Sequence, residues 1–518
     1  MNLSPIGLTA AKVPCNLRAV RADVTAAELI LACRAAADQR ARLVALWGSD
    51  DRDRGRGLRL SVALIDADGI TLLEHRLPDT NADYPDLARI FPAASRMQRA
   101  ARDLVGVASD ADDQHRWLRH ASWAPDTFPL QRDFVAASNG AVADEPYPFV
   151  RVEGDGVHEI PVGPVHAGII EPGHFRFQVV GEKVLRLEQR LGYVHKGIEK
   201  RFESMSIIEG ARLAGRVSGD STVAYAWAYA HAVEAIAGVA VPPRATWLRA
   251  LALERERIAN HLGDLGYLGN DGGLAFGLAQ FSRLKEDVLR VNQAAFGHRM
   301  AMDYIVPGGV ARDVDASGGA SMVGQCDALD REVTTLRGIF DEHAGLQDRF
   351  RNCGFVTPAL AAQLGLTGLA GRASGQAFDL RCDYPTPPYT ELDVRMATRN
   401  DGDVAARVAV RFDEVKESLR LIRAIVTGLP ASDLTGDVRL PLPPITPHRT
   451  GLGFVEGWRG PVFVALESGP ASAIHRCHPH DPSWTNWPVL EHAVIGNIVP
   501  DFPLINKSFN LSYSGHDL

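Results

Sequence analysis

Cysteine is scarce in this chain, and no two cysteines stand close together. The 518 residues contain six, at Cys15, Cys33, Cys326, Cys353, Cys382 and Cys477, and none forms a C-x-x-C pair. Scattered single cysteines are typical of reduced thiols in a cytosolic protein, not of a disulfide framework or a cluster site. The sequence therefore predicts that this chain carries no sulfur-ligated metal of its own.

A long apolar run, a basic excess and a secretory signal are also missing. No stretch approaches the roughly 20 uninterrupted apolar residues of a membrane span. The net charge is -8, with 55 lysines and arginines against 63 acidic residues, which argues against a nucleic-acid binder. The N-terminus lacks a charged start followed by an apolar block, so we expect no signal peptide. The chain is thus expected to be soluble and cytoplasmic.

What the chain does contain is a hydrophobic share of 46%, enough for a sizeable core. Residues 1–125 are predicted to form one small α/β unit. Ala26–Arg40 is rich in alanine and predicts a helix, Arg42–Trp47 predicts a strand, and Leu58–Asp66 alternates like a half-buried strand. A proline-containing linker follows over 126–148.

Residues 149–518 are predicted to be mainly helical, with a β-hairpin near the start. Tyr147–Glu153 and His174–Val180 have the pattern of short strands. Residues 248–265 and Asp403–Thr427 carry apolar side chains at a period of 3.6, which predicts two long helices.

The tail from Pro461 onward is predicted to be strand and loop. Together these segments predict an α+β fold.

Several short motifs follow one another along the chain. They are F-P-A-A-S and R-D-L-V-G-V (91–107), the G-P-V-H … E-P-G-H-F-R-F block (163–177), H-K-G-I-E-K (195–200), V-P-P-R-A-T-W-L-R (241–249), G-H-R-M … P-G-G-V (297–310) and E-G-W-R-G (456–460). Two more, R-V-S-G-D-S (216–221) and N-L-S-Y-S-G (510–515), contain paired small polar residues.

In this order the motifs resemble the large-subunit family shared by group 4 [NiFe] hydrogenases and complex I. The resemblance covers nearly the whole chain. Residues 1–125 are similar to the thirty-kilodalton subunit of complex I, and residues 149–518 to the forty-nine-kilodalton subunit of complex I and of NADH-quinone oxidoreductases. Formate hydrogenlyase large subunits have both parts fused in this way. The resemblance implies an oxidoreductase subunit that is active only within a complex.

The same resemblance identifies the positions where the family holds its Ni–Fe centre. The two family motifs read R-x-C-G-x-C and D-P-C-x-x-C, and their four thiolates bind the metals. Here these positions hold Ser218, Ser221, Ser512 and Gly515. A hydroxyl is not a thiolate, so we expect no Ni–Fe centre. The alternative is that these are ordinary helix-start and loop residues.

Two groups near the predicted hairpin are candidates for a proton path, Glu171 and His174. In metal-containing relatives, a glutamate of this hairpin lies near the active site. A carboxylate and an imidazole suit proton transfer because their pKa values can be tuned toward neutrality. The alternative is a structural pair that closes the hairpin turn.

Quinone binding remains possible on the resemblance, but the family's quinone-reducing pair is not in place. That pair is a histidine at the hairpin tip and a tyrosine three residues after the helix arginine. Here His166 stands earlier than the tip, and Gly219 occupies the tyrosine position. Tyr225 lies further along the same helix, where core packing is the alternative explanation.

Three other features are open or expected to be structural. His475, Cys477 and His478 offer N and S ligands for zinc, but no distant pair completes a site. The run Asp50–Arg54 is expected to be a solvated loop, and Gly308-Gly309 a turn.

The resemblance implies the large subunit of a membrane-attached, complex I-like assembly without a Ni–Fe centre. Its expected partners are a small subunit with a [4Fe–4S] cluster and membrane-arm subunits, which would place it on the inner face of the cell membrane. It would couple electron transfer, to a quinone or another acceptor, to ion translocation. The alternatives are a non-catalytic scaffold and an active nickel hydrogenase.

Overall fold

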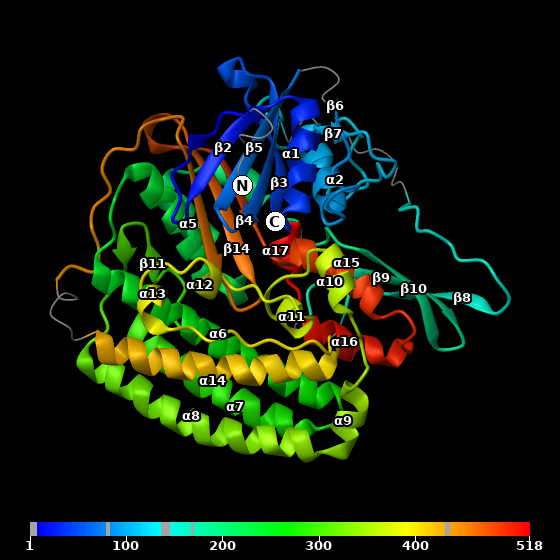
Figure 1. The fold of residues 1–518 in the computed structure, drawn as a ribbon, viewed down its shortest axis with the longest axis vertical. Helices are drawn as coiled ribbons and strands as arrows, with labels where there is room; N and C mark the ends of the chain where they lie inside the picture. The colour runs from blue at the N-terminus through cyan, green and yellow to red at the C-terminus, as the bar shows by residue number, and fades with distance from the viewer. Residues whose placement is uncertain (1–7, 79–82, 136–145, 167–169, 430–435) are drawn as a thin grey trace.

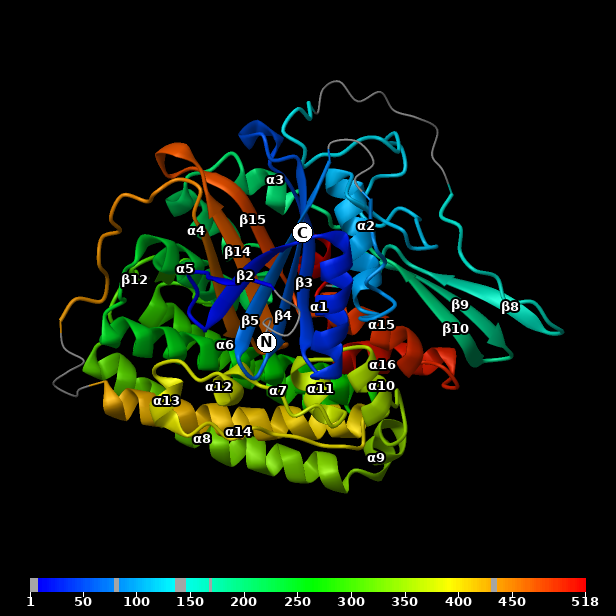
Figure 2. The same cartoon turned by 45° about the horizontal axis from the view of Figure 1, so that its top comes forward.

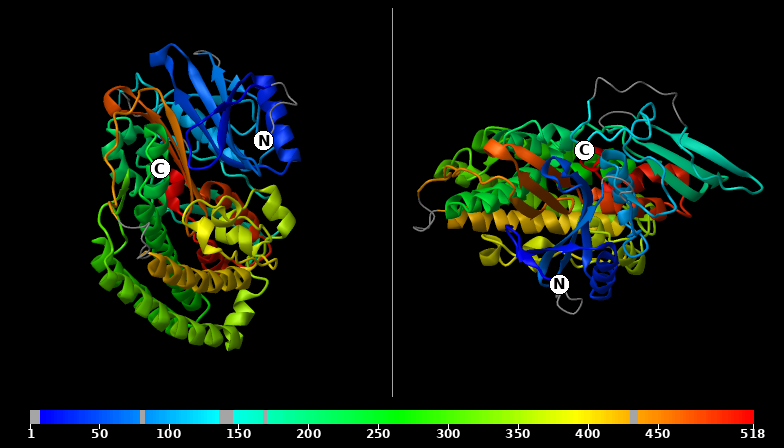
Figure 3. Two further views of the ribbon diagram at one scale, coloured as in Figure 1. Left: turned by 60° about the vertical axis from the view of Figure 1, so that its left-hand side comes forward. Right: turned by 90° about the horizontal axis from the view of Figure 1, so that it is seen from above.

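The structure is a computed structural model, and it describes residues 8–78, 83–135, 146–166, 170–429 and 436–518 (Figure 1). Helices and strands are mixed throughout, which confirms the predicted α+β class. The N-terminal strands lie at one end of the molecule and the long helices at the other, and Figures 2 and 3 show the same separation from other sides. Among the described residues, no helix combines the length and apolar character needed to cross a membrane.

The N-terminal unit is a five-stranded sheet with the order β1-β2-β5-β4-β3. Strands β2 and β5 are parallel and the other neighbours antiparallel. Helix α1 begins where predicted because Thr25 and Glu28 form a reciprocal capping box. The bounds are β1 (Ala11–Lys12), β2 (Ala19–Val24), α1 (Ala26–Asp38), β3 (Arg42–Asp50), β4 (Leu58–Asp66), β5 (Gly69–Leu77), β6 (Asp83–Tyr84), α2 (Ala94–Val105) and β7 (Ala108–Ser109).

A second sheet packs against one face of the first. It contains β13 (Thr450–Glu456), β14 (Pro461–Ser468) and β15 (Ile474–His480). Trp47 of the first sheet and Phe463 of the second share a buried cluster between them. The main hydrophobic core contains residues from both predicted parts of the chain, 1–125 and 149–518. The domain boundaries at 125 and 149 stay predictions.

Helix α5 (Thr222–Ala237) covers the far side of this second sheet. The helix and strand β13 approach closely at Gly453, where an added Cβ would lie 1.8 Å from the carbonyl oxygen of Ala228. Only glycine permits this backbone contact. The contact holds the middle of α5 against the sheet, and the start of this helix carries part of the site below.

Four long helices lie side by side beneath the sheets (Figures 1 and 2). They are α6 (Pro243–Asp271), α7 (Ala275–Phe296), α8 (Ala316–Glu342) and α14 (Val404–Gly428). The helices predicted over 248–265 and 403–427 are therefore confirmed. The other helices of the second part are α3 (Ile198–Phe202), α4 (Ile207–Ala214), α9 (Ala344–Phe350), α10 (Pro358–Gln363), α11 (Gly368–Ala373), α12 (Leu380–Asp383) and α13 (Tyr389–Leu392).

A three-stranded sheet stands where the β-hairpin was predicted, with β9 (His174–Val180) between β8 (Val157–Val162) and β10 (Lys183–Arg190). The strand predicted at 147–153 is wrong. Tyr147 and Phe149 instead pack against arginine side chains, 5.1 Å from Arg190 and 4.6 Å from Arg176. The aromatic residues that suggested a strand are half-buried by these contacts and do not join a ladder.

The tail after Pro461 contains the predicted strands and three helices besides. These are α15 (Ser483–Ala493), α16 (Phe502–Phe509) and α17 (Tyr513–Asp517). Two short hairpin strands, β11 (Ile305–Val306) and β12 (Gly309–Val310), pair where the Gly308-Gly309 turn was predicted. Four 3₁₀ turns complete the described elements, at Arg52–Arg54, Gly219–Ser221, Pro470–Ser472 and Val499–Asp501.

A network of fully buried ion pairs holds the second part together. Arg372 of α11 bonds Glu414 of α14 at 2.7 Å and Glu456 of β13 at 2.9 Å. Arg257 of α6 also bonds Glu414, at 3.0 Å. The arginine side chains are 0% exposed and the carboxylates at most 3%. Because each buried charge has an opposite partner, the network tolerates its burial and joins α6, α11, α14 and β13.

Candidate functional site

The two serine-bearing motifs meet in space, as the resemblance implied. Ser218 and Ser512, 294 residues apart, lie with their Oγ atoms 2.8 Å from one another. Ser221 stands at the start of α5, and Gly515 lies in α17, where its backbone N–H donates to Ser512 Oγ over 2.8 Å. We call Ser218, Ser221, Ser512 and Gly515 the serine site. All three serines are buried, at 2–4% exposure.

An ion pair occupies the centre of the serine site. Arg459, from the turn after β13, donates to both carboxylate oxygens of Asp220 and to Ser221 Oγ over 3.2 Å. Ser218 donates to Asp220 over 2.8 Å, so its neighbour Ser512 donates to Ser218. Burial alone would raise the pKa of Asp220, but Arg459 and the two hydroxyls outweigh it and lower that pKa. The site therefore holds a charge-compensated carboxylate.

The fourth position leaves no room for a side chain. A Cβ added to Gly515 would lie 2.4 Å from Asp481 Oδ2 and 2.9 Å from Ser512 Oγ. Asp481 is 1% exposed and accepts a hydrogen bond from the Tyr225 hydroxyl over 2.8 Å. The Tyr225 hydroxyl on α5 therefore bonds a carboxylate of the site. In the sequence, only the position of Tyr225 on the same helix as the motif had suggested such a contact.

Of the two proton-path candidates, the structure brings one to the site. The backbone N–H of Ser514 donates to Glu171 Oε2 over 3.1 Å, so the half-buried Glu171 lies against α17. His174 lies at the start of β9, where its Nδ1 is 3.2 Å from the carbonyl of Gly163 and its Nε2 accepts from Arg176. Burial lowers the pKa of His174, and its neutral ring has both nitrogens bonded.

A further carboxyl lies beneath the serine site. Glu256 of α6 accepts backbone N–H bonds from Val223 and Ala224 in the first turn of α5, at 2.7 and 3.3 Å. Burial raises the pKa of Glu256 to about 8, against the opposing effect of these two hydrogen bonds. Glu256 therefore carries a proton at neutral pH.

This pKa predicts a pH dependence of stability. The unfolded carboxyl ionises near pH 4.5 and the folded one near 8, so the folded state binds the extra proton. The contribution of Glu256 is complete below pH 4.5 and is lost as the pH rises toward 8. Between pH 6 and 7, the free energy of unfolding of Glu256→Gln is expected to rise by about 1.4 kcal/mol relative to that of the wild type. Chemical denaturation at the two pH values measures it. If the free energies of unfolding of the two proteins changed in parallel with pH, this prediction would be wrong.

The groups considered for quinone have different neighbours. His166 turns back to the hairpin, with its Nε2 2.7 Å from the carbonyl oxygen of Gly173. Gly219 is exposed, and a Cβ added there would have no neighbour within 4 Å. The face beside the serine site is thus open at Gly219, and the Asp220 side chain is 37% exposed there.

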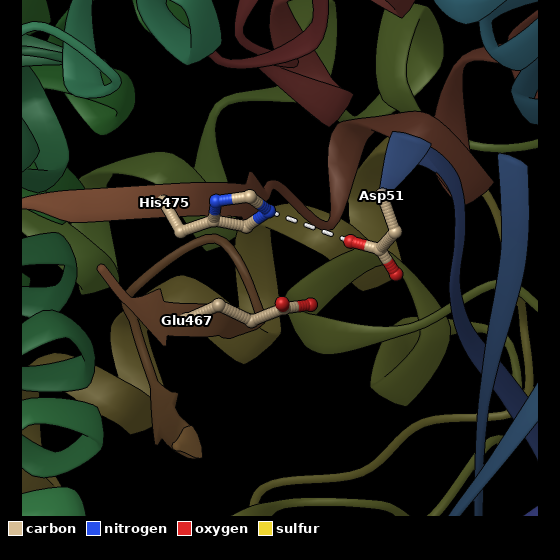
Figure 4. A group of neighbouring side chains, drawn as sticks. All are labelled: Asp51, Glu467 and His475. Atoms are coloured by element: carbon tan, nitrogen blue, oxygen red, sulfur yellow. Dashed lines mark hydrogen bonds and ion pairs between the residues drawn. The ribbon is translucent and has the colours of Figure 1, made fainter. Parts of the chain in front are cut away.

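The histidine-rich strand does not assemble the zinc site that was considered. Among the described residues, the group with metal-ligand spacing is Asp51, Glu467 and His475, whose ligand atoms lie within 4.8 Å of one another (Figure 4). Arg59 bonds both carboxylates, and Arg54 lies 3.2 Å from Glu467. These guanidinium groups already compensate the carboxylates.

Cys477 and His478 lie outside that group. Burial raises the pKa of the Cys477 thiol well above its usual value, and His478 Nδ1 bonds Glu199 over 2.7 Å. The expected solvated loop at Asp50–Arg54 is wrong, because Asp50 and Asp51 are 1–2% exposed. Asp50 pairs with Arg52 of the same run and Asp51 with Arg59 of β4, so their charges are compensated and buried instead of solvated.

Sequence reasoning missed several groups of the site. Asp220 occupies a variable position inside the R-x-S-G-x-S motif, and Arg459 was noted only as part of E-G-W-R-G. Asp481 and Glu256 lie in helical or loop segments without a motif that was recognised. The one available signal was that Asp220 and Arg459 each lie inside a matched motif.

Comparisons with known proteins agree with the resemblance to complex I and hydrogenase large subunits. Residues 22–139 match the model of the respiratory-chain NADH dehydrogenase 30 kDa subunit, and 271–450 that of the 49 kDa subunit. Formate hydrogenlyase subunit 5 of Escherichia coli is 32% identical, over 84% of this chain and 77% of that protein. Hydrogenase-4 component G of the same organism is 30% identical, over 92% and 83%.

Two further matches cover the second part. NADH-quinone oxidoreductase subunit 4 of Thermus thermophilus is 30% identical, over 67% of this chain and 91% of that protein. A solved structure of the membrane-bound sulfane sulfur reductase, an archaeal respiratory membrane complex, covers 70% of this chain and 99% of its own at a TM-score of 0.66 and 25% identity. The chain therefore belongs to the oxidoreductase family of complex I-like and hydrogenase large subunits, with both of the matched NADH dehydrogenase subunit types fused in one polypeptide.

Proposed function

We propose that this chain is the large subunit of a membrane-attached, complex I-like oxidoreductase that works without a Ni–Fe centre. The observation that carries the proposal is the serine site. Its donors are neutral hydroxyls bonded to one another and to Asp220, whereas nickel and iron of this kind require soft thiolates. The Arg459 guanidinium already balances the carboxylate. The residues present do not fit the metal pair, and no step is assigned to it.

Electrons would reach the serine site from a [4Fe–4S] cluster in a small partner subunit. The open face at Gly219 and the partly exposed Asp220 suit such a neighbour, and the relatives are named as subunits of hydrogenases and of NADH-quinone oxidoreductases. Partners of the membrane arm would hold the assembly on the inner face of the cell membrane. The acceptor would be a quinone or another small molecule.

In this proposal the protein itself handles protons. Glu171 reaches the site through the Ser514 backbone, and Glu256 holds a proton beneath it. A carboxylate that touches the site from its half-buried edge can exchange protons with water outside. His174 remains a candidate for the outer end of this path. Electron arrival at the cluster would then change the charge at these groups and so favour ion movement in the partner subunits.

The second candidate function is that of a non-catalytic scaffold, which would only join the peripheral and membrane arms of the complex. The compensated Asp220–Arg459 pair favours it, because such a pair also fastens the C-terminal tail to α5 without any chemistry.

Metal analysis and acceptor titration of the purified intact complex test the proposal. We expect iron without stoichiometric nickel, and reoxidation of the reduced cluster on addition of ubiquinone or menaquinone. Because the matched archaeal complex is a sulfane sulfur reductase, polysulfide is a useful second acceptor. Stoichiometric nickel together with hydrogen evolution would refute the absence of a Ni–Fe centre. A cluster that no acceptor reoxidises would favour the scaffold.

A further inference from the structure

His480, the last residue of β15, is buried with neither ring nitrogen bonded. It is 3% exposed, and no described residue provides a hydrogen-bond partner for its Nδ1 or its Nε2. A buried imidazole without any partner is unfavourable by the desolvation of its polar atoms. The structure therefore has to supply another partner at this position.

Two small cavities both include His480 in their lining. The inner cavity, of about 20 Å³, is lined by His478, His480, Trp484 and Glu199. The outer cavity, of about 30 Å³, is lined by His480 and Thr367 and by the half-exposed Arg42. A water molecule needs roughly 10–15 Å³ of such space. Each cavity thus has room for at least one water.

Polar atoms without partners face both cavities. Among the residues that the structure describes, His478 Nε2 and Trp484 Nε1 of the inner cavity and Thr367 Oγ1 of the outer one are buried and unbonded. Because His478 Nδ1 donates to Glu199, its Nε2 is an acceptor, while the Trp484 N–H is a donor. Water, which both donates and accepts, satisfies such a set, and an apolar guest does not.

Hydrogen bonds link the lining of the inner cavity to the backbone beside the serine site. Besides Glu199 it is lined by Leu518, whose carbonyl oxygen accepts from the backbone of Lys196 over 2.9 Å. The Lys196 ammonium donates to the carbonyl oxygen of Val217 over 2.8 Å, and Val217 precedes Ser218. At the other end, the outer cavity borders the half-exposed Arg42 and Gly365.

We propose that ordered water fills both cavities and that His480 passes protons between them, from the outer cavity at Arg42 to the water of the inner cavity beside Glu199. In each transfer one ring nitrogen accepts a proton and the other releases one, so the ring ends neutral in its second tautomer. Rotation of the ring then restores the first tautomer before the next transfer. Burial lowers the pKa of His480 well below its usual value, which agrees with a ring that is neutral between transfers. The relay rests on the proposed function, since reduction of the partner's cluster would draw the protons.

The test uses the intact complex and measures proton uptake with a pH-indicator dye after rapid reduction. We expect His480→Phe and His480→Gln to slow the uptake at least tenfold without slowing reduction of the cluster. The isosteric Thr367→Val is expected to slow it several-fold, and the exposed control His492→Phe to leave it unchanged. Glutamine keeps a hydrogen-bonding group but has no second tautomer, so it carries the test if the phenylalanine variant fails to assemble.

Wild-type uptake rates in an assembled His480 variant would overturn the relay and leave the proposed function standing. A wild-type complex that takes up no proton on reduction would overturn both. An experimental structure at a resolution that shows water should contain water in both cavities, and two dry cavities would overturn the relay independently of any activity.

Discussion

Replacing Arg372 by methionine is expected to lower the free energy of unfolding by about 3–5 kcal/mol. The side chain is 0% exposed and bonds Glu414 and Glu456, which are themselves buried. Burial alone would raise the pKa of Glu414, but Arg372 and its other partners hold that pKa well below the usual range. Without the guanidinium these carboxylates lose much of their compensation. Chemical denaturation of the purified protein measures the effect.

Arg290→Met is the matched control, because Arg290 also pairs with a glutamate, Glu286, but its side chain is 73% exposed. An exposed pair of this kind contributes less than about 0.5 kcal/mol. Similar losses in the two variants would mean that burial does not decide the energetics of the network. A loss below about 1 kcal/mol for Arg372→Met would mean that the neighbouring arginines are sufficient.

The largest functional effect is expected for Glu171→Gln, which should reduce proton-coupled turnover of the intact complex by about 10²-fold or more. The amide keeps the size of the side chain and can still accept the hydrogen bond from the Ser514 backbone. It cannot take up and release a proton at any ordinary pH. The measurement is steady-state electron transfer to the acceptor identified by titration, with solvent isotope effects recorded in parallel.

Glu182→Gln provides the control, since Glu182 is an exposed carboxyl in the turn between β9 and β10. It should leave turnover unchanged. If Glu171→Gln and His174→Ala both retain full activity in an assembled complex, the scaffold becomes the better account. A Glu171→Gln variant that transfers electrons normally but no longer moves ions would place the carboxyl in coupling alone.

The sequence accounted well for elements with a strong local signal. Helix α14 follows an apolar stripe that begins after its N-cap, Asp403, and β9 and β4 lie where their strand patterns predicted them. The expectation that β4 is half-buried was wrong, because both of its faces are buried. Ordered motifs also identified the serine site, because the spacing within each motif fixes which residues share one turn. The strand predicted at 147–153 was wrong because its half-buried aromatic rings pack against arginines of β9 and β10 and do not join a ladder.

Charged residues mark the limit of such reasoning. Asp51 and Arg411 resemble solvated residues by their local pattern, yet they are at most 2% exposed. Their partners, Arg59 and Asp264, come from other elements, and only the fold brings the opposite charges together. A charged side chain is buried only where a partner compensates it, and the local sequence does not identify that partner.

By itself, the sequence determined the family and the α+β class, and it predicted that serine and glycine stand at the four thiolate positions. These depend on residue types and on spacing along the chain, which are local. The tertiary structure alone decided what stands at those positions: Asp220 paired with Arg459, Asp481 against Gly515, and Glu256 protonated beneath them. The reason is that charge compensation and desolvation act between groups that are close in space, and folding brings them together from segments up to about 300 residues apart.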